Sequence, residues 1–123
     1  MRKTGSVGTV TKKRIWDAAI NLMAEHGFDA VSMRDLAAAV GIQAASVYGY
    51  VSSKQHLLLD IMEGGQRELL RRLRADVLSQ PNAVAQLRGF VRLHIEFFLS
   101  RPNEVRLIYW GLRSLTPLNR KKL

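Results

Sequence analysis

The stretch Leu-Ala-Ala-Ala-Val-Gly-Ile-Gln-Ala-Ala-Ser-Val-Tyr-Gly-Tyr, residues 36–50, decides the fold of this chain. It predicts two short helices that meet at a steep angle, with a glycine at the corner. Ala37 is small, as a close helix crossing requires, and Gly41 lies where the turn needs a positive φ. The residues that would lock the two helices together are apolar: Leu36, Val40, Ile42 and Val47. This helix-turn-helix pattern is typical of proteins that place one helix in the major groove of DNA.

The composition is that of a small globular domain. The chain has 123 residues, 47% of them hydrophobic, and no cysteine, so disulfides and thiolate chemistry are excluded. No apolar signal-peptide core follows the basic N-terminus, and no apolar run approaches the roughly 20 residues that a membrane span needs. We therefore expect a soluble cytoplasmic protein with no membrane partner.

The net charge of +9 is compatible with nucleic-acid binding, because phosphates are neutralised by lysine and arginine. Its distribution is uneven. Residues 1–60 contain seven basic and five acidic residues, whereas residues 61–123 contain twelve basic and five acidic residues. Most of the excess positive charge thus lies outside the helix-turn-helix region, and the motif rather than the charge supports the prediction.

The rest of the sequence shows only helical periodicity, which predicts an all-α fold. Residues 1–10 are expected to form a flexible arm, and Thr11 to cap a first helix that ends near His26, before Gly27. Ser32 and Asp35 have the spacing of a capping box at the start of the second helix. The apolar face of the first helix is predicted to be formed by Ile15, Ala18, Ala19, Leu22 and Met23.

Longer helices follow the motif. One is predicted from Ser53 to about Ser79, where Gly64-Gly65 marks either a kink or the close approach of a neighbour. Two more are expected over about 83–99 and 104–113. Thr116-Pro117 predicts the start of a seventh helix, and we expect the chain to be cut shortly after it. The core-facing residues of the fifth helix are predicted to be Val84, Leu87, Val91, Ile95 and Phe98.

The third helix, expected from about residue 43 to 48, would present its exposed side to the bases. Gln43 can form a bidentate pair with adenine, and Ser46 can bond a base or a phosphate, while two alanines allow close approach. Tyr48, Tyr50 and Lys54 would lie near phosphates. The residues predicted to face DNA are Ser32, Arg34, Gln43, Ala44, Ala45, Ser46, Tyr48, Gly49, Tyr50 and Lys54.

These residues also have purely structural interpretations. Either tyrosine would instead wedge the third helix against the core, and Lys54 would instead be a solvated surface lysine. Several basic residues near the N-terminus have two possible roles. They would contact DNA, along its backbone or in the minor groove, or they would form a solvated tail. These residues are Arg2, Lys3, Lys12, Lys13 and Arg14. Three arginines on one face of the fourth helix are either solvated or a second partner surface: Arg67, Arg71 and Arg74.

The sequence offers no support for catalysis, a cofactor or a metal. His94 and Glu96 are two residues apart and therefore point to different sides of a helix, and His26 and His56 are isolated. No serine belongs to a histidine and aspartate arrangement, and no glycine-rich loop follows a strand. We therefore expect a binding protein rather than an enzyme.

Residues from about 14 to 60 resemble the tetracycline-repressor (TetR/AcrR) family of bacterial regulators. The matching segments are Arg14–Phe28, Ser32–Ala37, Val40–Ile42, Ser46–Tyr48, Tyr50 and Ser53-Lys54, which together extend over nearly half of the chain. A shorter resemblance, over Leu112–Pro117 and Asn119–Lys122, is to family members that regulate fatty-acid or acyl-CoA catabolism.

The resemblance implies a sequence-specific DNA-binding regulator, a ligand-responsive repressor in the bacterial cytoplasm. It implies a DNA-binding domain over residues 11–71, with the helix-turn-helix at about 33–52, and part of a helical ligand-binding and dimerisation domain over 72–123. A full-length homodimer would bind a palindromic operator, and a small hydrophobic effector such as an acyl-CoA would spread the two DNA-binding domains. The family's chains are longer and dimerise mostly through two C-terminal helices that this sequence lacks.

Two alternatives belong to other functional classes. One is a helical small-molecule-binding module whose DNA-binding part is vestigial. Its pocket would be lined by Phe90, Leu93, Phe97, Tyr109 and Trp110, although residues at helical spacing are more often plain core. The other is an interaction fragment that pairs with a full-length relative and blocks it.

Overall fold

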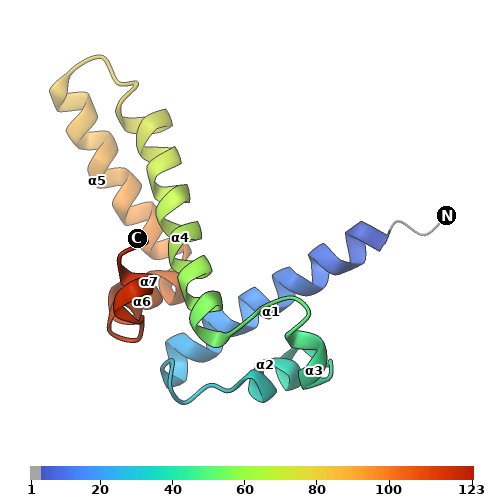
Figure 1. Cartoon of the computed structure of the whole chain (residues 1–123). Helices are drawn as coiled ribbons and strands as arrows, with labels where there is room; N and C mark the ends of the chain where they lie inside the picture. The colour runs from blue at the N-terminus through green and yellow to red at the C-terminus, as the bar shows by residue number, and fades with distance from the viewer. Residues whose placement is uncertain (1–3) are drawn as a thin grey trace.

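The computed structural model describes residues 4–123, with side chains from residue 7 onward, and every regular element in this range is helical (Figure 1). The all-α prediction is confirmed. A π-helical turn, η1, continues the fourth helix over Leu73–Val77, and a 3-10 turn, η2, follows the sixth over Gly111–Arg113. The α-helices are α1 (Thr4–His26), α2 (Met33–Val40), α3 (Ala44–Val47), α4 (Lys54–Arg72), α5 (Ala83–Ser100), α6 (Pro102–Trp110) and α7 (Pro117–Arg120).

The helices form two parts that meet at α6 and α7 (Figure 1). The first part consists of α1, with α2 and α3 lying below it in this view. The second is an antiparallel pair in which α4 rises away from the helix-turn-helix and α5 returns toward it. Helix α6 packs on both α1 and α4, and so connects the two parts. In the part of the chain that the structure describes, no helix is long and apolar enough to cross a membrane.

The main hydrophobic core lies among α1, α2, α3 and the first turns of α4. Its most deeply buried side chains include Ile15 from α1, Leu36 from α2, Val47 from α3 and Leu58 from α4. The core also takes residues from far along the chain, because Leu107 and Leu115 are buried in it and Leu123 packs against it. The first part of the molecule, which we call the head, is therefore completed by residues from the C-terminal half.

Helix α1 begins earlier than the sequence indicates. The predicted cap, Thr11, lies inside the helix, where its Oγ1 donates a hydrogen bond to the carbonyl of Val7 at 3.0 Å. The expected arm over residues 1–10 is thus wrong from Thr4 onward, and Arg2 and Lys3 lie outside the described residues. An existing helix adds residues at low cost, so glycines that favour an arm in isolation are accommodated in its first turns.

The prediction of which face of α5 packs on the core is also wrong. Val84, Leu87, Val91 and Ile95 are about half exposed or more, whereas the buried residues of α5 are Leu93 and Phe97. Helix α5 is apolar on two sides, and its close approach to η1 selects one of them. A Cβ atom at Gly89 would lie 3.2 Å from the carbonyl oxygen of Asp76, so glycine permits this contact. Phe98, the fifth residue of the predicted face, is also exposed.

The glycine pair in α4 serves close packing, one of the two predicted alternatives. Helix α4 continues without a break through Gly64 and Gly65. A Cβ atom at Gly65 would lie 2.7 Å from Cδ1 of Ile108 in α6, and one at Gly64 would lie 3.3 Å from the Trp16 ring in α1. The two glycines therefore allow α1 and α6 to approach α4 closely.

Candidate nucleic-acid interface

The N-terminus of α2 is closed by the predicted capping box. Ser32 Oγ accepts a hydrogen bond from the Asp35 amide at 3.1 Å, and the Ser32 amide donates to Asp35 Oδ2 at 2.8 Å. The backbone bond from Ser32, aided by its hydroxyl, holds the pKa of Asp35 below its usual value. The hydroxyl proton of Ser32 is directed to Asp35 Oδ2, so the amides of Met33 and Arg34 are the first-turn donors left for a phosphate.

The turn between α2 and α3 has the geometry expected of it. Gly41 adopts φ +78°, and its amide donates to the carbonyl of Ala37 at 2.9 Å. The guanidinium of Arg14 in α1 donates to the carbonyl of Val40 at 2.8 Å, which satisfies the end of α2. Ala37 is buried at the crossing, as predicted. The corner is therefore fixed both by its own backbone and by α1.

The exposed surface of helix α3 consists of polar and small side chains. Gln43 is its N-cap residue, but the side chain makes no capping hydrogen bond and is exposed. Ala45, Ser46 and Gly49 are exposed beside it, whereas Ala44 is half-buried and packs on the core. The side-chain amide of Gln43 is thus available to a base, and small residues surround it.

The two tyrosines differ. Tyr48 is 56% exposed, and its side chain points away from the core, whereas Tyr50 is half-buried and packs against it. The structural interpretation therefore applies to most of the Tyr50 ring. A contact between either hydroxyl group and DNA stays a prediction.

Lys54 is neither a simple surface lysine nor a free cation. Its Nζ donates to the carbonyl of Phe28 at 2.8 Å and lies 4.2 Å from the centroid of the Phe28 ring. These contacts join the start of α4 to the segment that follows α1. The ammonium group has three donors, so Lys54 can hold Phe28 and still bond a phosphate.

The basic residues of α1 are partly engaged within the head. Lys13 forms an ion pair with Asp17 at 3.0 Å, and Arg14 binds Val40 as described above. Lys12 is exposed and makes no ion pair with another described residue. Arg34, in the first turn of α2, is likewise exposed with no ion pair in the described part of the chain. Of these two, Arg34 lies in the first turn of α2, at the proposed interface, whereas Lys12 lines a groove with Gly64 of α4 and Glu104 of α6.

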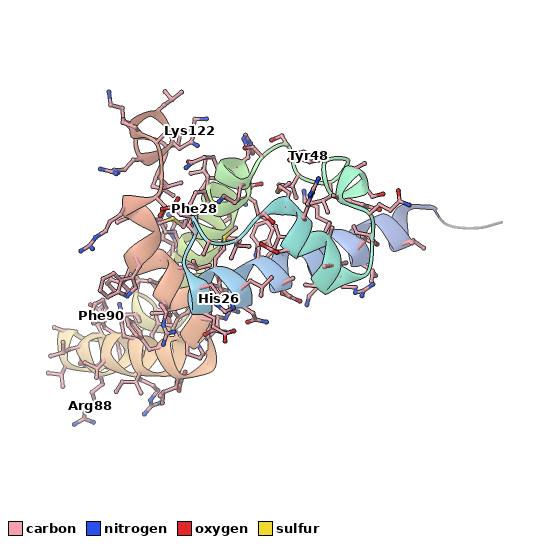
Figure 2. All side chains as sticks on the ribbon, turned by 90° about the horizontal axis from the view of Figure 1, so that it is seen from below. His26, Phe28, Tyr48, Arg88, Phe90 and Lys122 are labelled. Atoms are coloured by element: carbon pink, nitrogen blue, oxygen red, sulfur yellow. The ribbon has the colours of Figure 1, made fainter. Side chains whose placement is uncertain are left out.

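Figure 2 shows the head from below, with the exposed Tyr48 labelled; that the ten predicted residues form one DNA-binding surface stays a prediction. The predicted surface combines an exposed amide, a hydroxyl, a phenol and the N-terminus of α2. Such groups can bond base edges and phosphates, and the alanines allow close approach. Among the described residues, no group of three histidine or carboxylate side chains could hold a metal ion.

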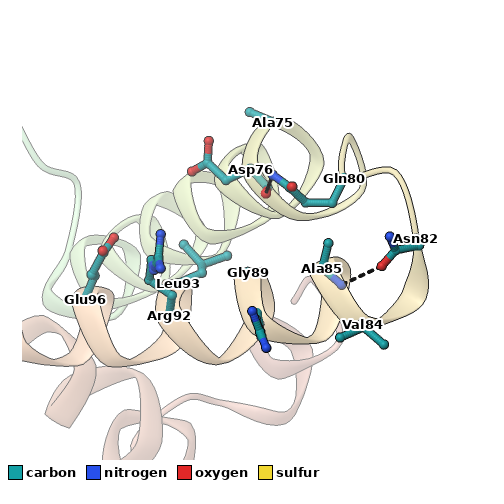
Figure 3. A pocket seen from close by; sticks show the side chains of 11 residues that line it. Ala75, Asp76, Gln80, Asn82, Val84, Ala85, Gly89, Arg92, Leu93 and Glu96 are labelled. Carbon is teal, nitrogen blue, oxygen red and sulfur yellow. Dashed lines mark hydrogen bonds between the residues drawn. The ribbon is translucent and has the colours of Figure 1, made fainter.

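The residues proposed to line an effector pocket differ in their burial. Leu93 and Phe97 are buried, whereas Phe90, Tyr109 and Trp110 are exposed. A groove between α5 and η1 takes Leu93 from this set but is mainly polar, with Asp76 and Glu96 among its lining residues (Figure 3). An apolar effector site formed by these five residues stays a prediction.

The structural roles of two residues were not predicted from the sequence, although Arg14 was named there as a candidate contact to DNA. Arg14 satisfies the end of α2, and Gln55, in the first turn of α4, bonds the segment around Ser114 and Thr116. Each partner is distant in sequence from the residue that binds it. Neither local periodicity nor spacing could have identified these contacts.

The sequence is similar to a known family of proteins and to several of its members. The family model described as "Bacterial regulatory proteins, tetR family" matches residues 15–61. The transcriptional regulator BetI of Agrobacterium fabrum is 40% identical over 68 residues, covering 55% of this chain and 31% of that protein. The transcriptional repressor KstR2 of Rhodococcus jostii is 32% identical over 85 residues, covering 69% and 42%. The chain thus spans less than half the length of these curated relatives.

Solved structures share the fold over most of the chain. The TetR-family regulator PfmR of Thermus thermophilus superposes with a TM-score of 0.81 at 30% identity, covering 89% of this chain and 59% of that one. The regulator AibR, solved with isovaleryl coenzyme A and operator DNA, gives a TM-score of 0.79 at 27% identity, covering 91% and 61%.

Proposed function

The chain belongs to the TetR family of bacterial regulatory proteins, and from this premise we propose that it is a sequence-specific DNA-binding transcriptional repressor. In this proposal α3 enters the major groove, and the N-termini of α2 and α4 bind phosphates on either side. The relatives that match are transcriptional regulators, in agreement with a role in binding rather than catalysis.

The observation that supports the proposal most directly is the state of Gln43. Its side chain stands exposed at the start of α3 without a capping hydrogen bond, beside exposed Ala45 and Ser46. Glutamine is not one of the short polar residues that cap helices, so its longer side chain extends beyond the first-turn amides. Gln43 thus leaves both its donor and its acceptor free to pair with a base.

The test is fluorescence anisotropy with labelled DNA from beside the protein's own gene, compared with a scrambled duplex over a salt series. We expect tighter binding to the native DNA and a steep loss of affinity as salt rises, because bound phosphates release counterions. Absence of binding to both duplexes by folded protein would contradict the proposal and favour the ligand-binding or interaction alternative.

Substitution of Gln43 separates base reading from backbone binding. Gln43→Ala should reduce discrimination at one base pair by about 1–3 kcal/mol and leave binding to scrambled DNA nearly unchanged. Tyr48→Phe should instead weaken binding to both duplexes. Gln80→Ala, near the far end of the α4–α5 pair, serves as a control for loss of a glutamine side chain. An unchanged base preference in Gln43→Ala would remove this residue from the recognition role.

The finer parts of the function are proposed on the relatives' properties. We propose a homodimer on a palindromic operator, in which residues 11–71 bind DNA and residues 72–123 contribute to the domain for the partner subunit and an effector. The exposed apolar residues of α5 support the proposal that a partner subunit or further helices cover this face. AibR, whose solved complex contains isovaleryl coenzyme A, supports an acyl-CoA as the class of effector. A bacterial cytoplasmic location accords with this role.

A further inference from the structure

The charged side chains in the last part of the chain are all basic. Residues 111–123, which we call the C-terminal basic segment, contain four basic residues and no acidic one. The basic residues are Arg113, Arg120, Lys121 and Lys122. The segment comprises η2, the residues that follow it and α7. It accounts for a third of the lysine and arginine residues in the C-terminal half of the chain.

This segment is fixed to the head. The side-chain amide of Gln55 donates to the carbonyl of Ser114, and its Oε1 accepts from the Thr116 amide at 3.2 Å and from Asn119 Nδ2 at 3.4 Å. Leu115 is 3% exposed within the main core, and Leu123 packs against that core. The segment therefore has a defined position relative to the helix-turn-helix.

Its positive charges are not neutralised within the described part of the chain. All four basic side chains are exposed, and none forms an ion pair with another described residue. Arg120 donates to the carbonyl of Leu115 at 3.4 Å, and Arg113 lies over the Trp110 ring at 5.2 Å. Lys121 and Lys122 make no side-chain hydrogen bond with other described residues. Exposed cations without an ion-pair partner attract a polyanion, and few existing contacts have to break when the polyanion binds.

The position of the segment indicates which polyanion. Gln55, its main anchor, directly follows Lys54 in the first turn of α4, the end of α4 that the proposed function places near phosphates. Seen from below in Figure 2, Lys122 projects on the same side of the molecule as Tyr48, whereas Arg88 of α5 projects on the opposite side. The segment thus lies beside the start of α4, whereas α3 lies on the other side of the head in Figure 1.

We propose that the C-terminal basic segment is a second DNA-contact surface, which binds backbone phosphates next to those reached by the start of α4 and outside the site read by α3. The inference rests on the proposed function, because it assigns a further contact to the same DNA. Lysine binds phosphate as a point charge, so this contact adds affinity without sequence preference. It also gives a role to basic residues that lie outside the helix-turn-helix.

The test compares two pairs of substitutions that remove the same charge. Lys121→Gln/Lys122→Gln alters the segment and leaves the Gln55 and Leu115 anchors in place. Arg88→Gln/Arg92→Gln removes two exposed arginines from α5 as the matched control. Anisotropy over a salt series gives the slope of log Kobs against log salt for each protein, and circular dichroism checks that each variant is folded.

We expect the lysine pair to lower the magnitude of the salt slope by about 2, since each phosphate contact contributes about 0.9 on duplex DNA. Affinity for native and scrambled DNA should fall by the same factor, and the arginine pair should keep the wild-type slope. Equal slopes for all three proteins, or equal changes in both variants, would overturn the inference and leave the proposed function intact. Failure of the wild-type chain to bind DNA would overturn both.

Discussion

Gly41 determines the corner of the helix-turn-helix through its backbone alone. Its φ is +78°, and no heavy atom outside its immediate neighbours lies within 4 Å of a Cβ built at this position. A side chain there would meet no steric obstacle from the rest of the fold. The requirement for glycine is therefore entirely conformational.

Gly41→Ala should destabilise the protein by about 1–2 kcal/mol, the cost of placing an L side chain in the left-handed region. Urea denaturation followed by circular dichroism measures this change. Gly8→Ala is the matched control, because Gly8 lies in α1 with open space around it and no positive φ. It should be neutral or stabilising by up to about 1 kcal/mol. Equal stability of the two variants would contradict this explanation of Gly41.

At the scale of single residues, the turn and the helix cap of the interface were predictable from the sequence, whereas its hydrogen bonds between distant residues were not. Gly41, Ser32 and Asp35 were predictable because turns and caps depend on residues within a few positions of one another. The bonds of Arg14 to Val40 and of Lys54 to Phe28 join residues 26 positions apart. Such contacts depend on the tertiary fold, which local patterns do not encode.

At the scale of elements, α5 shows how an amphipathic pattern can mislead. Its sequence places apolar residues on two sides, and periodicity alone does not identify the side that packs. The side that packs is the one that meets η1 at Gly89, and the buried residues of α5 are Leu93 and Phe97. Helices α2 and α3 were predictable because their apolar residues occupy one side only.

The buried face of α5 can be tested with two identical substitutions. Leu93 is 3% exposed and Leu87 is 65% exposed on the same helix. Leu93→Ala should cost about 2–5 kcal/mol through loss of buried surface and a residual cavity, as measured by denaturant unfolding. Leu87→Ala in the monomeric chain should change stability by about 0.5 kcal/mol or less. The reverse order would show that the predicted face is the one that packs.

One carboxylate at the junction between α4 and α6 has three basic neighbours. Glu68 accepts hydrogen bonds from Arg71 at 2.8 Å and from Arg72 at 2.9 Å, and lies 3.9 Å from Arg101 at the start of α6. The hydrogen bonds from Arg71 and then Arg72 lower the pKa of Glu68 to about 2. Because the folded pKa is lowered, the stabilisation is complete above the ordinary value of 4.5 and is lost as pH falls toward 2.

Glu68→Gln should therefore be less stable than wild type at pH 7, and this difference should shrink as pH falls from 4.5 toward 2. Urea unfolding at several pH values gives the two curves. Glu63→Gln is the control, since it removes a carboxylate of the same helix whose pair with Arg67 is 3.9 Å long. A constant difference between Glu68→Gln and wild type over this pH range would exclude the proposed ion-pair effect.

For the whole molecule, the head and the C-terminal half form one structure rather than two independent ones. Leu107 and Leu115 complete the core of the head, and α6 packs on both α1 and α4. The division at residue 71 inferred from the sequence therefore does not coincide with a division in packing, and as a division of function it stays a prediction. This arrangement also gives residues 111–123 a fixed place beside the start of α4, where the proposed second DNA contact lies.

In the function proposed above, the chain binds DNA with α3 and the start of α2. A titration of the isotopically labelled protein with a DNA duplex, followed by amide chemical shifts in NMR spectra, measures which residues the DNA contacts. We expect the largest shifts at Arg34, Gln43, Ser46 and Tyr48, with residues near the tip of the α4–α5 pair unchanged. Shifts confined to α5, or no shifts at millimolar DNA and low salt, would contradict the account.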